Sequence, residues 1–536
     1  MAKIRRIGGA AVCLMWLASC THAPQRTTDA AFNPETATAV FNAGYAMIQD
    51  KYIEPVTAEQ VAMAGLDGLE KIDDKLSFER RGDKVRVSFG DRPGAELLAP
   101  PATNIAGWAH LTSLAIDLAR DDSPALAATA SEDIYQTLFK SALGTLDRYS
   151  RYTTAASARN AREMRDGYGG IGVRLKYGEP GDVKVEAVMP DTPAARADLR
   201  AGDKIIRIDS TPVDGLDERD VVERLRGRIA SQVKLTLLRA ERPEPFDVAI
   251  SRALIFNTTV EYQAHGSAAV IKLSSFNQST SRNLTRAIER ARREMGPEMK
   301  GIVLDMRGNP GGLLDQAVNV SDLFLSGGRI VSTRGRHPDS LQAYDATGRD
   351  ITNGLPLVVL VNGQSASAAE IVAAALQDRG RAVVVGSNSF GKGTVQNISR
   401  MPNDGELVLT WSRFHAPSGY PIAELGVLPN VCTSTEGASV DGVLDQFNPM
   451  WVKTSILLST WRIPQARDAQ QTTTLRDNCP RSKNSAEIDL IVAERLIDDP
   501  ALYRRAMQQN GPVMAEPALE TPAVLGASAA RILGIQ

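Results

Sequence analysis

The sequence has little of what metal-binding, disulfide-rich and nucleic-acid-binding proteins require. Its 536 residues include four cysteines and five histidines, which form no Cys-x-x-Cys pair and no His-Glu-x-x-His motif. We therefore expect neither a disulfide-dense scaffold nor a zinc site. The 61 basic and 63 acidic residues nearly cancel, and aromatic residues make up 5%. Because nucleic acid is held by positive charge and stacking, we expect no nucleic-acid partner. We also expect no metal or organic cofactor.

The apolar run closest to the N-terminus is too short to cross a bilayer as a mature helix. It occupies residues 7–17 and follows basic residues, a pattern typical of a secretory signal peptide. The next tetrapeptide, Leu17-Ala18-Ser19-Cys20, resembles the lipobox of bacterial lipoproteins. It predicts a signal peptide over 1–19 and lipidation of Cys20. A plain signal peptide with an unrelated cysteine is the alternative. Because Thr21 follows rather than aspartate, resemblance to lipoprotein sorting rules favours the outer membrane.

Export would place the protein on the periplasmic side of the cell envelope, anchored to the membrane by its lipid. Cys432 and Cys479 would then be the two remaining cysteines, because Cys13 lies in the signal peptide. Two cysteines in an oxidising compartment predict one disulfide bond, with two buried free thiols as the alternative. Residues 20–37 are mostly small or polar and include two prolines, which is typical of a tether.

The composition, with 43% apolar and 23% charged residues, is that of a globular protein with several domains. Apolar residues at helical spacing predict a mostly helical N-terminal region over 38–165. Short alternating stretches interrupt this pattern at 76–98, where we expect a hairpin-like insertion. Strand, short helix, strand, helix and strand patterns over 167–252 predict a compact β/α module.

The remainder of the chain alternates strand and helix patterns. This texture over 255–465 predicts an α/β core with much parallel strand pairing, so the fold class is a multi-domain α/β protein. A helical extension is expected at 466–510. The tail 511–536 is rich in proline and alanine and is expected to be disordered.

Three turns rich in small residues follow strands of the predicted core. The first, 305–312, carries glycines that can free backbone N–H groups for an oxyanion. The second, 365–367, opens a helix whose dipole favours negative charge. The third resembles a phosphate-binding loop, but Gly393 stands where that motif needs serine or threonine after Lys392. Taken singly, the three are better explained as a tight turn, a helix cap and a solvated lysine.

Together and in this order, the turns resemble the catalytic domain of the carboxyl-terminal processing proteases, also called tail-specific proteases. The resemblance covers about residues 38–432 and implies a crotonase-like α/β protease core with an inserted PDZ-like module. Its motifs are LDRYSRY at 146–152, YGGIGV at 168–173, DMRGNPGG at 305–312, SASAAEI at 365–371 and SFGKGTVQ at 389–396.

Carried over residue by residue, the resemblance implies a Ser/Lys dyad. Ser367 would be the nucleophile, Lys392 its base and Gln396 the residue that orients the lysine. A lysine titrates near about 10.4 in water, so it must lose solvent to act as a neutral base at neutral pH. The backbone N–H groups expected to hold the oxyanion are those of Ala368 and of Gly311 or Gly312.

The PDZ-like module would bind a peptide by adding a strand to its sheet edge. The loop expected to hold the terminal carboxylate consists of Gly169, Gly170, Ile171 and Gly172. Arg196 and Arg200 lie where the module could contact the protease core. The implied partners are proteins or peptides with accessible C-termini. An adaptor protein and self-association are left open.

The implied function is a serine endopeptidase that cleaves exported proteins near or from their C-termini. Two other interpretations stand beside it. A catalytically silent, lipid-anchored PDZ scaffold does not account for Ser367, Lys392 and Gln396 occurring together. A crotonase-like enzyme acting on an acyl thioester does not account for the PDZ-like module or for the 25 positions between the serine and the lysine.

Overall fold

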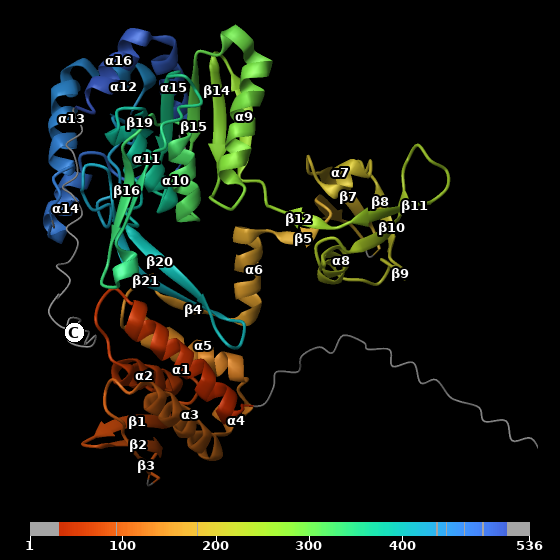
Figure 1. Cartoon of the computed structure of the whole chain (residues 1–536), viewed down its shortest axis with the longest axis vertical. Coiled ribbons are helices and arrows are strands. Elements are labelled where there is room, and N and C mark those ends of the chain that lie inside the picture. Colours follow the sequence, from red (N-terminus) through yellow and green to blue (C-terminus); the bar gives the residue numbers. More distant parts are fainter. Residues whose placement is uncertain are drawn as a thin grey trace, which may run out of the picture.

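The computed structural model describes most of the chain but neither end. The described residues are 32–511, apart from 93, 180, 436–437, 446, 466 and 485–486. The predicted signal peptide, Cys20 and most of the predicted tether lie outside them, as does the predicted tail from residue 512 onward. Within the described part, no helix combines the length and apolar character needed to cross a bilayer. The helical N-terminal region and the α/β core lie along the long axis, and the PDZ-like module projects to one side (Figure 1).

The N-terminal region packs its helices around large buried aromatic side chains. Phe41, Tyr45, Trp108 and Phe139 are all fully buried in one cluster. Capping begins the first helix, because the Asn33 side chain accepts the Thr36 N–H at 2.9 Å. The helices are α1 (Pro34–Lys51), α2 (Ala58–Asp67), α3 (Ile105–Asp122), α4 (Pro124–Ala128), α5 (Ser131–Gly144) and α6 (Ala155–Asp166), with the 3-10 turn η1 (Gly68–Lys71).

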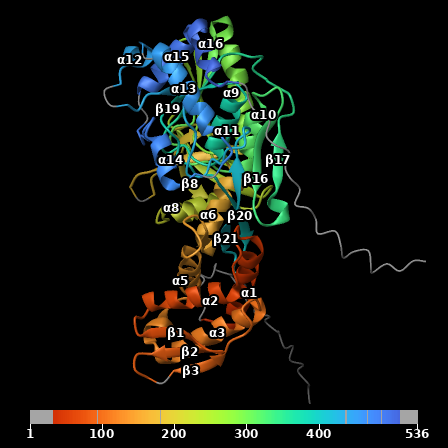
Figure 2. The same cartoon turned by 90° about the vertical axis from the view of Figure 1, so that its left-hand side faces the viewer.

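The segment predicted to be a hairpin-like insertion forms a three-stranded antiparallel sheet instead. Its strands are β1 (Leu76–Arg81), β2 (Lys84–Phe89) and β3 (Ala95–Leu98). The third strand is short and mostly exposed, so it carries little hydrophobic alternation. Figure 2 shows this sheet at the far end of the N-terminal region, away from the α/β core.

The PDZ-like module is an antiparallel sheet with two short helices. The sheet order is β11-β10-β8-β7-β6, so β6 is an edge strand. Alternating burial along β7 and β10 places their apolar residues in one core. A two-stranded neck of β5 (Tyr168–Gly170) and β12 (Ala253–Ile255) joins the module to the rest. Its elements are β6 (Val173–Tyr177), β7 (Val183–Val188), α7 (Pro193–Arg196), β8 (Lys204–Ile208), β9 (Thr211–Pro212), α8 (Glu218–Leu225), β10 (Gln232–Leu238) and β11 (Phe246–Ser251).

The α/β core contains a six-stranded sheet in the order β13-β14-β15-β18-β19-β22. Pairing is parallel from β14 to β22, as the alternating pattern predicts, and antiparallel between β13 and β14. Its central strands are continuous apolar runs, because helices cover both faces. The strands are β13 (Val260–His265), β14 (Ala268–Leu273), β15 (Gly301–Asp305), β18 (Leu357–Val361), β19 (Val383–Gly386) and β22 (Val431–Cys432).

Two sets of helices cover this sheet. On β15, Ile302 and Leu304 pack with the first set, while Val303 packs with the second. The first set is α9 (Thr280–Met295), α10 (Leu314–Asp322) and α11 (Ala368–Asp378), with the 3-10 turn η2 (Gly296–Glu298) after α9. The second set is α15 (Glu487–Asp498) and α16 (Pro500–Gln508). The C-terminal extension therefore forms part of the hydrophobic packing of the core.

A second sheet connects the α/β core to the N-terminal region (Figure 1). Its order is β17-β16-β21-β20, with β4 paired to β21. Its elements are β4 (Arg151–Thr153), β16 (Arg329–Arg334), η3 (Pro338–Ser340), β17 (Gln342–Asp345), β20 (Thr394–Arg400) and β21 (Glu406–His415). Buried Glu406 on β21 receives Arg162 at 3.1 Å and Arg165 at 2.9 Å from α6. These ion pairs attach the helix before the module to the connecting sheet.

The C-terminal extension is tied to the α/β core by a disulfide bond. Cys432 and Cys479 are bonded with an S–S distance of 2.07 Å, the pair that the sequence leads us to expect. A buried cation adds to the attachment, because Arg307 pairs with Asp305 at 2.7 Å and with Asp489 of α15 at 3.0 Å. Between β22 and α15 the chain also forms α12 (Val440–Asp445) and α13 (Phe447–Trp461), which precede the predicted extension, and α14 (Ala469–Arg476), which lies within it.

We expect Glu406→Gln to lower the free energy of unfolding by roughly 2–3 kcal/mol at pH 7, because two guanidinium groups lose their carboxylate. Burial opposes the charge of Glu406, but Arg165 and Arg162 together hold its pKa below the ordinary value. The stabilisation is therefore complete above the ordinary glutamate pKa of about 4.3. It is lost as the pH falls through the lower pKa of the folded state.

Urea unfolding at a series of pH values from 7 down to 3 measures this difference. The gap between wild type and Glu406→Gln should narrow as the pH falls, because the wild-type carboxylate becomes protonated. The control is Asp122→Asn, which breaks an ion pair with Arg92 whose side chains are 51% and 65% exposed. It should cost no more than about 0.5 kcal/mol. A gap that stays constant across the series would contradict the prediction.

Candidate active site

Three loops leave the carboxyl ends of three neighbouring parallel strands. Residues 306–313 follow β15, residues 362–367 follow β18 and residues 387–393 follow β19. Because the carboxyl ends of parallel strands meet at one edge of a sheet, the three loops lie side by side. The three motifs that the sequence analysis singles out are these loops.

Ser367 occupies a strained backbone position between β18 and α11. Its φ is +57°, in the left-handed region that residues with a Cβ seldom adopt. Such a conformation costs on the order of 1–3 kcal/mol and persists only where surrounding contacts hold it. The Ser367 N–H donates to the Glu370 carboxylate at 2.8 Å, which supplies such a contact. The turn between strand and helix therefore presents a half-buried serine at its tip.

Ser365, the other serine of the motif, is part of the turn's scaffold. It is fully buried. Its hydroxyl donates to the Met306 carbonyl at 2.8 Å and accepts the Asn362 N–H at 2.9 Å. These bonds join the loops after β15 and β18. Of the two serines, Ser367 is the one that a substrate can reach.

The carboxylate of Glu370 holds the serine turn and the lysine loop together. The side chain is fully buried, and burial raises its pKa although four donors oppose the shift. Its oxygens accept Ser389 Oγ at 2.5 Å, Gly391 N at 2.6 Å, Ser367 N at 2.8 Å and Lys392 N at 2.9 Å. One oxygen, Oε2, serves both Ser367 and Lys392, so their backbone nitrogens lie close together.

No role for Glu370 is predicted from the sequence, although its position fits a helix-capping pattern. A serine before a helix with glutamate three residues later matches the capping-box pattern. In the structure this glutamate reaches back to the Ser367 N–H. It also reaches across to the loop that follows β19.

Lys392 lies half-buried at the end of a tightly packed loop. Burial lowers its pKa and the nearby positive charge of Arg151 adds to the effect, while Glu370 opposes it. Its ammonium nitrogen lies 5.5 Å from the centre of the Tyr149 ring. Gly393 leaves no room for a side chain, since a Cβ there would come within 1.9 Å of the Ala423 nitrogen. Among the described residues, none forms a hydrogen bond or ion pair with Lys392 Nζ, and this includes Ser367.

Gln396, the predicted orienting residue, forms its side-chain hydrogen bonds with residues other than Lys392 in this structure. Its side-chain amide donates to Thr394 at 2.9 Å and to Thr410 at 3.4 Å. Thr410 in turn donates to Asp147 at 3.1 Å. The Gln396 side chain is therefore half-buried in a polar cluster beside the lysine loop.

Residues 147–150 of the N-terminal region form one wall of the site. Asp147 accepts the Tyr149 N–H at 2.6 Å and the Ser150 hydroxyl at 2.6 Å, and this fixes the turn that carries the Tyr149 ring. Ser150 also accepts the Thr410 N–H at 3.0 Å. This stretch contributes to the family resemblance of the sequence, but the sequence predicts no role for it in the site. The structure places Tyr149 beneath the lysine.

The glycine turn after β15 approaches Ser367 closely. A Cβ on Gly311 would lie 2.7 Å from the Ser367 Cβ, and the Gly311 φ of +101° also excludes most side chains. Its N–H already donates to the Asn309 side chain at 2.8 Å. The N–H groups of Gly312 and Ala368 donate to no other described residue. Of the predicted oxyanion donors, the structure therefore leaves Gly312 and Ala368 free to bind an oxyanion.

The histidine nearest in sequence to the lysine motif lies in the second sheet, outside the three loops. Burial, with Arg334 and Arg413 nearby, lowers the pKa of His415 to about 4, so it is neutral at pH 7. It lies on β21, paired with Ser332 of β16. In the described part of the chain, no group of three or more histidine, cysteine, aspartate or glutamate residues is arranged to hold a metal ion.

A groove of about 490 Å³ lies between β6 and α8 of the PDZ-like module. Gly170, Ile171 and Gly172 of the predicted carboxylate-binding loop line it, and so do apolar residues such as Val222. Gly169 does not line it and pairs with Leu254 in the neck. The edge strand β6 is therefore free to accept a peptide strand along this groove.

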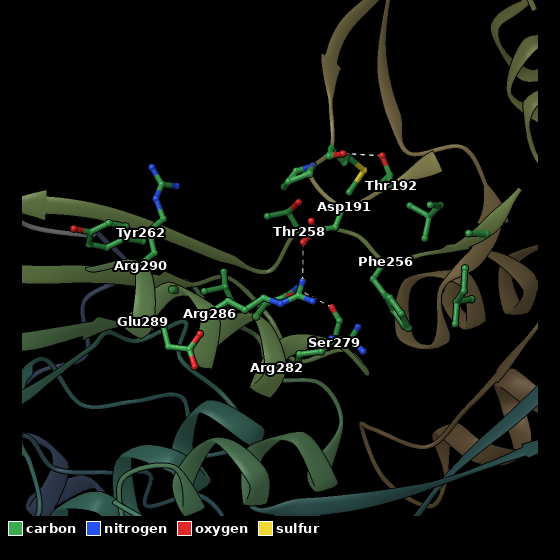
Figure 3. Close-up of a pocket in the computed structure, with 18 of the residues that line it drawn as sticks. Asp191, Thr192, Phe256, Thr258, Tyr262, Ser279, Arg282, Arg286, Glu289 and Arg290 are labelled. Atoms are coloured by element: carbon green, nitrogen blue, oxygen red, sulfur yellow. Dashed lines mark hydrogen bonds and ion pairs between the residues drawn. The ribbon is translucent and has the colours of Figure 1, made fainter. Parts of the chain in front are cut away.

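A second cleft of about 550 Å³ separates the module from α9, as Figure 3 shows. Arg286 of α9 crosses it to Asp191 at 3.1 Å. The two arginines proposed from the sequence do not cross it. Arg196 donates to the Asp191 carbonyl at 2.9 Å, and Arg200 pairs with Asp198 at 2.8 Å, both within the module. Their neighbouring acceptors within the module explain this difference.

Comparisons with known proteins agree with this arrangement. Residues 267–433 match peptidase family S41, and residues 184–239 match the PDZ domain. A carboxy-terminal-processing protease of Bartonella bacilliformis is 41% identical over 273 residues, which are 50% of this chain and 63% of that protein. A probable CtpA-like serine protease of Staphylococcus aureus is 33% identical over 268 residues, covering 50% of this chain and 53% of that protein.

The chain thus spans between half and two thirds of the length of these curated relatives. Among solved structures, the photosystem II D1 C-terminal processing protease aligns over 76% of this chain and 97% of its own, at 23% identity and a TM-score of 0.36. The match to peptidase family S41 covers the strands and loops of the candidate site, the match to the PDZ domain lies in the projecting module, and the curated relatives include a carboxy-terminal-processing protease.

Proposed function

We propose that the protein is a serine endopeptidase with a Ser/Lys dyad that cleaves proteins near or from their C-termini. The observation that carries this proposal is the double attachment to Glu370. One buried carboxylate holds the turn of Ser367 and the loop of Lys392, so a nucleophile and a partly desolvated amine lie in adjacent segments. A serine hydroxyl needs a base to become an effective nucleophile, and a lysine with a lowered pKa supplies one.

In the proposed reaction, Ser367 Oγ attacks the peptide carbonyl carbon and neutral Lys392 accepts the hydroxyl proton. The N–H groups of Ala368 and Gly312 stabilise the oxyanion. Lys392 then gives the proton to the leaving amine, and the C–N bond breaks to leave an ester on Ser367. Water attacks that ester with Lys392 again as the base. This releases the carboxylate product and restores the serine.

Substrate binding would complete the dyad. Ser367 and Lys392 are not hydrogen-bonded in the substrate-free protein, and Gln396 is engaged by Thr394 and Thr410. We propose that an extended substrate beside Ser367 draws the lysine toward the hydroxyl, and that Gln396 leaves its threonine partners to orient the amine. Catalytic hydrogen bonds are often incomplete without substrate, so this change is compatible with the proposed mechanism.

The PDZ domain would capture the free C-terminus of the substrate. A peptide would add to β6 and place its last side chain among the apolar residues of the groove, with its carboxylate at Gly170–Gly172. Residues 1–20 support export and a lipid anchor at the outer membrane as part of the same proposal. The substrates would then be exported proteins.

Replacing either member of the dyad should abolish turnover. We expect Ser367→Ala and Lys392→Ala each to lower kcat by roughly 10⁴-fold or more, and the double variant to lose little further, because the two residues act as one unit. Peptide hydrolysis and labelling by a fluorophosphonate probe, with the site read by mass spectrometry, measure this. The matched control is Ser365→Ala, which should keep labelling at Ser367 with reduced thermal stability. Labelling that persists in Ser367→Ala would contradict the assignment.

The pH dependence should report the lysine. Lys392 must be neutral to accept a proton, so kcat should rise with pH and then level off. The midpoint of this rise should lie below about 10.4. Arg151→Met removes a positive charge that lowers this pKa. The midpoint should therefore move to higher pH. Arg151→Lys keeps the charge and should leave the midpoint near the wild-type value. A shift toward lower pH in Arg151→Met would be inconsistent with a lysine base.

The PDZ groove should require a free carboxylate. We expect the full-length Ser367→Ala protein to bind a fluorescent peptide with an apolar C-terminal residue at least roughly tenfold more tightly than the same peptide amidated at its C-terminus. Val222→Glu, in the groove, should weaken binding similarly because it places a charge among apolar residues. Exposed Glu223→Ala is the control for α8. Equal anisotropy titrations for the two peptides would contradict carboxylate recognition.

A further inference from the structure

A segment of the C-terminal extension contacts the loops that carry both members of the proposed dyad. We call residues 476–483, which begin at the last residue of α14, the brace. In Figure 1, α14 lies against the side of the α/β core. The match to peptidase family S41 ends at residue 433, so the brace lies outside it.

Arg476 grips the loop that leads to Lys392. Its guanidinium donates to the Ser389 carbonyl at 2.8 Å, to the Leu425 carbonyl at 3.0 Å and to the Glu424 carbonyl. In return, the Asn388 side chain donates to the Arg476 carbonyl at 2.9 Å. The guanidinium therefore connects the lysine loop to the segment at residues 424–425.

The far end of the brace reaches the turn before Ser367. The Gly363 N–H donates to the Ser482 carbonyl at 2.6 Å, and the Asn362 side chain donates to the Lys483 carbonyl at 3.1 Å. The Ser482 N–H also donates to the Ser387 hydroxyl at 3.1 Å. A single stretch of chain thus joins both loops from outside.

The lysine loop is consequently held from two sides. The Ser389 hydroxyl donates a hydrogen bond to Glu370 at 2.5 Å, and the Ser389 carbonyl accepts one from Arg476 at 2.8 Å. The Gly391 N–H donates to Glu370 at 2.6 Å. A Cβ added to Gly391 would lie 2.9 Å from the Arg476 guanidinium. Lys392 is the next residue. Loss of one of these two contacts would free the segment that sets the position of its amine.

The Cys432–Cys479 disulfide fixes the brace to the sheet. Cys479 is fully buried three residues after Arg476, and Cys432 ends β22. Reduction by a dithiol would transfer two electrons and two protons to this bond. It would leave two thiols and convert the dithiol to its own disulfide. The brace would then be held only by its hydrogen bonds and packing.

We propose that Arg476 is a positioning residue for Lys392 and that the disulfide keeps it in place, so that full activity requires the oxidised protein. This inference rests on the proposed Ser/Lys function. Without Arg476 the lysine loop moves and water reaches Lys392, so the amine becomes protonated at neutral pH and its alignment with Ser367 loosens. Both effects lower kcat, and neither changes the PDZ groove.

The test compares Arg476→Met, Arg476→Lys and the control Arg467→Met in the full-length protein. Arg467 also donates to backbone carbonyls, including that of Thr460 at 2.6 Å, but its hydrogen bonds reach no residue of either loop. We expect Arg476→Met to lower kcat at pH 7 by roughly ten- to a hundredfold, with KM within about twofold of wild type. The acidic limb of its pH profile should move to higher pH. Arg476→Lys should recover part of both effects, and Arg467→Met should show neither.

Hydrogen exchange gives a second readout that does not depend on activity. The amides of residues 388–393 should exchange faster in Arg476→Met than in wild type or Arg467→Met. Unchanged kcat, pH profile and exchange in a folded Arg476→Met would overturn the inference. If wild type neither hydrolyses peptides nor labels at Ser367, the proposed function fails instead. The exchange data then still decide whether Arg476 holds the loop.

The disulfide is tested by reduction. Dithiothreitol should slow wild type and shift its pH limb in the same direction as Arg476→Met, and it should have no further effect on Cys432→Ser/Cys479→Ser. Arg476→Met should respond to dithiothreitol much less than wild type, because the contact that the disulfide protects is already gone. Full wild-type activity with both thiols free and alkylated would overturn the redox part.

Discussion

The arrangement of the candidate site depends on one buried carboxylate with four donors. Glu370 lies in the first turn of α11, so the turn that carries Ser367 and the helix that follows set its position. The parallel neighbour β19 brings the lysine loop within reach, because the carboxyl ends of β18 and β19 lie at the same edge of the sheet. Burial of a carboxylate is costly unless its oxygens are bonded, and here the backbone of both loops supplies the donors. Hydrogen-bond donors of the serine turn and of the lysine loop are thus accepted by the same carboxylate. A change in either one leaves polar groups of the other unpaired.

The site needs parts from three regions of the chain. The α/β core supplies Ser367 and Lys392, while the N-terminal region supplies the Tyr149 ring through the Asp147 turn. The C-terminal extension supplies Arg476. The connecting sheet makes this possible, since β4, which follows the Tyr149 turn, pairs with β21. The ion pairs of Glu406 with α6 hold the same sheet against the helix that leads to the PDZ domain. The position of the PDZ domain and the shape of the site therefore share one structural support.

Much of this could be predicted from the sequence, because strand ends and glycine turns leave local signals. The order of the turns, the parallel core and the cysteine pair are of this kind. Side-chain partners are not. Gln396 lies four residues after Lys392, a spacing that puts two residues of a regular strand on one face. Lys392 precedes β20, and the pairing of β20 with β21 shifts register between Val395 and Gln396, so the alternation does not extend from one to the other. The Gly311 N–H donates to the Asn309 side chain, only two residues away. This hydrogen bond leaves no periodic pattern in the sequence.

The surroundings of Lys392 show why long-range contacts decide the protonation of its amine. A glutamate close to Lys392 would by itself stabilise the ammonium and raise the lysine pKa, and Glu370 does act in that direction. Its oxygens, however, are already occupied by four N–H and O–H donors, so the lysine amine gains no direct ion pair. Burial opposes the charge, and the Arg151 cation adds to that opposition. The effect of Glu370 is therefore mainly geometric, because it fixes the loop while the surroundings favour a neutral amine. A carboxylate with a free oxygen at the same place would hold the loop as well but would keep the lysine protonated.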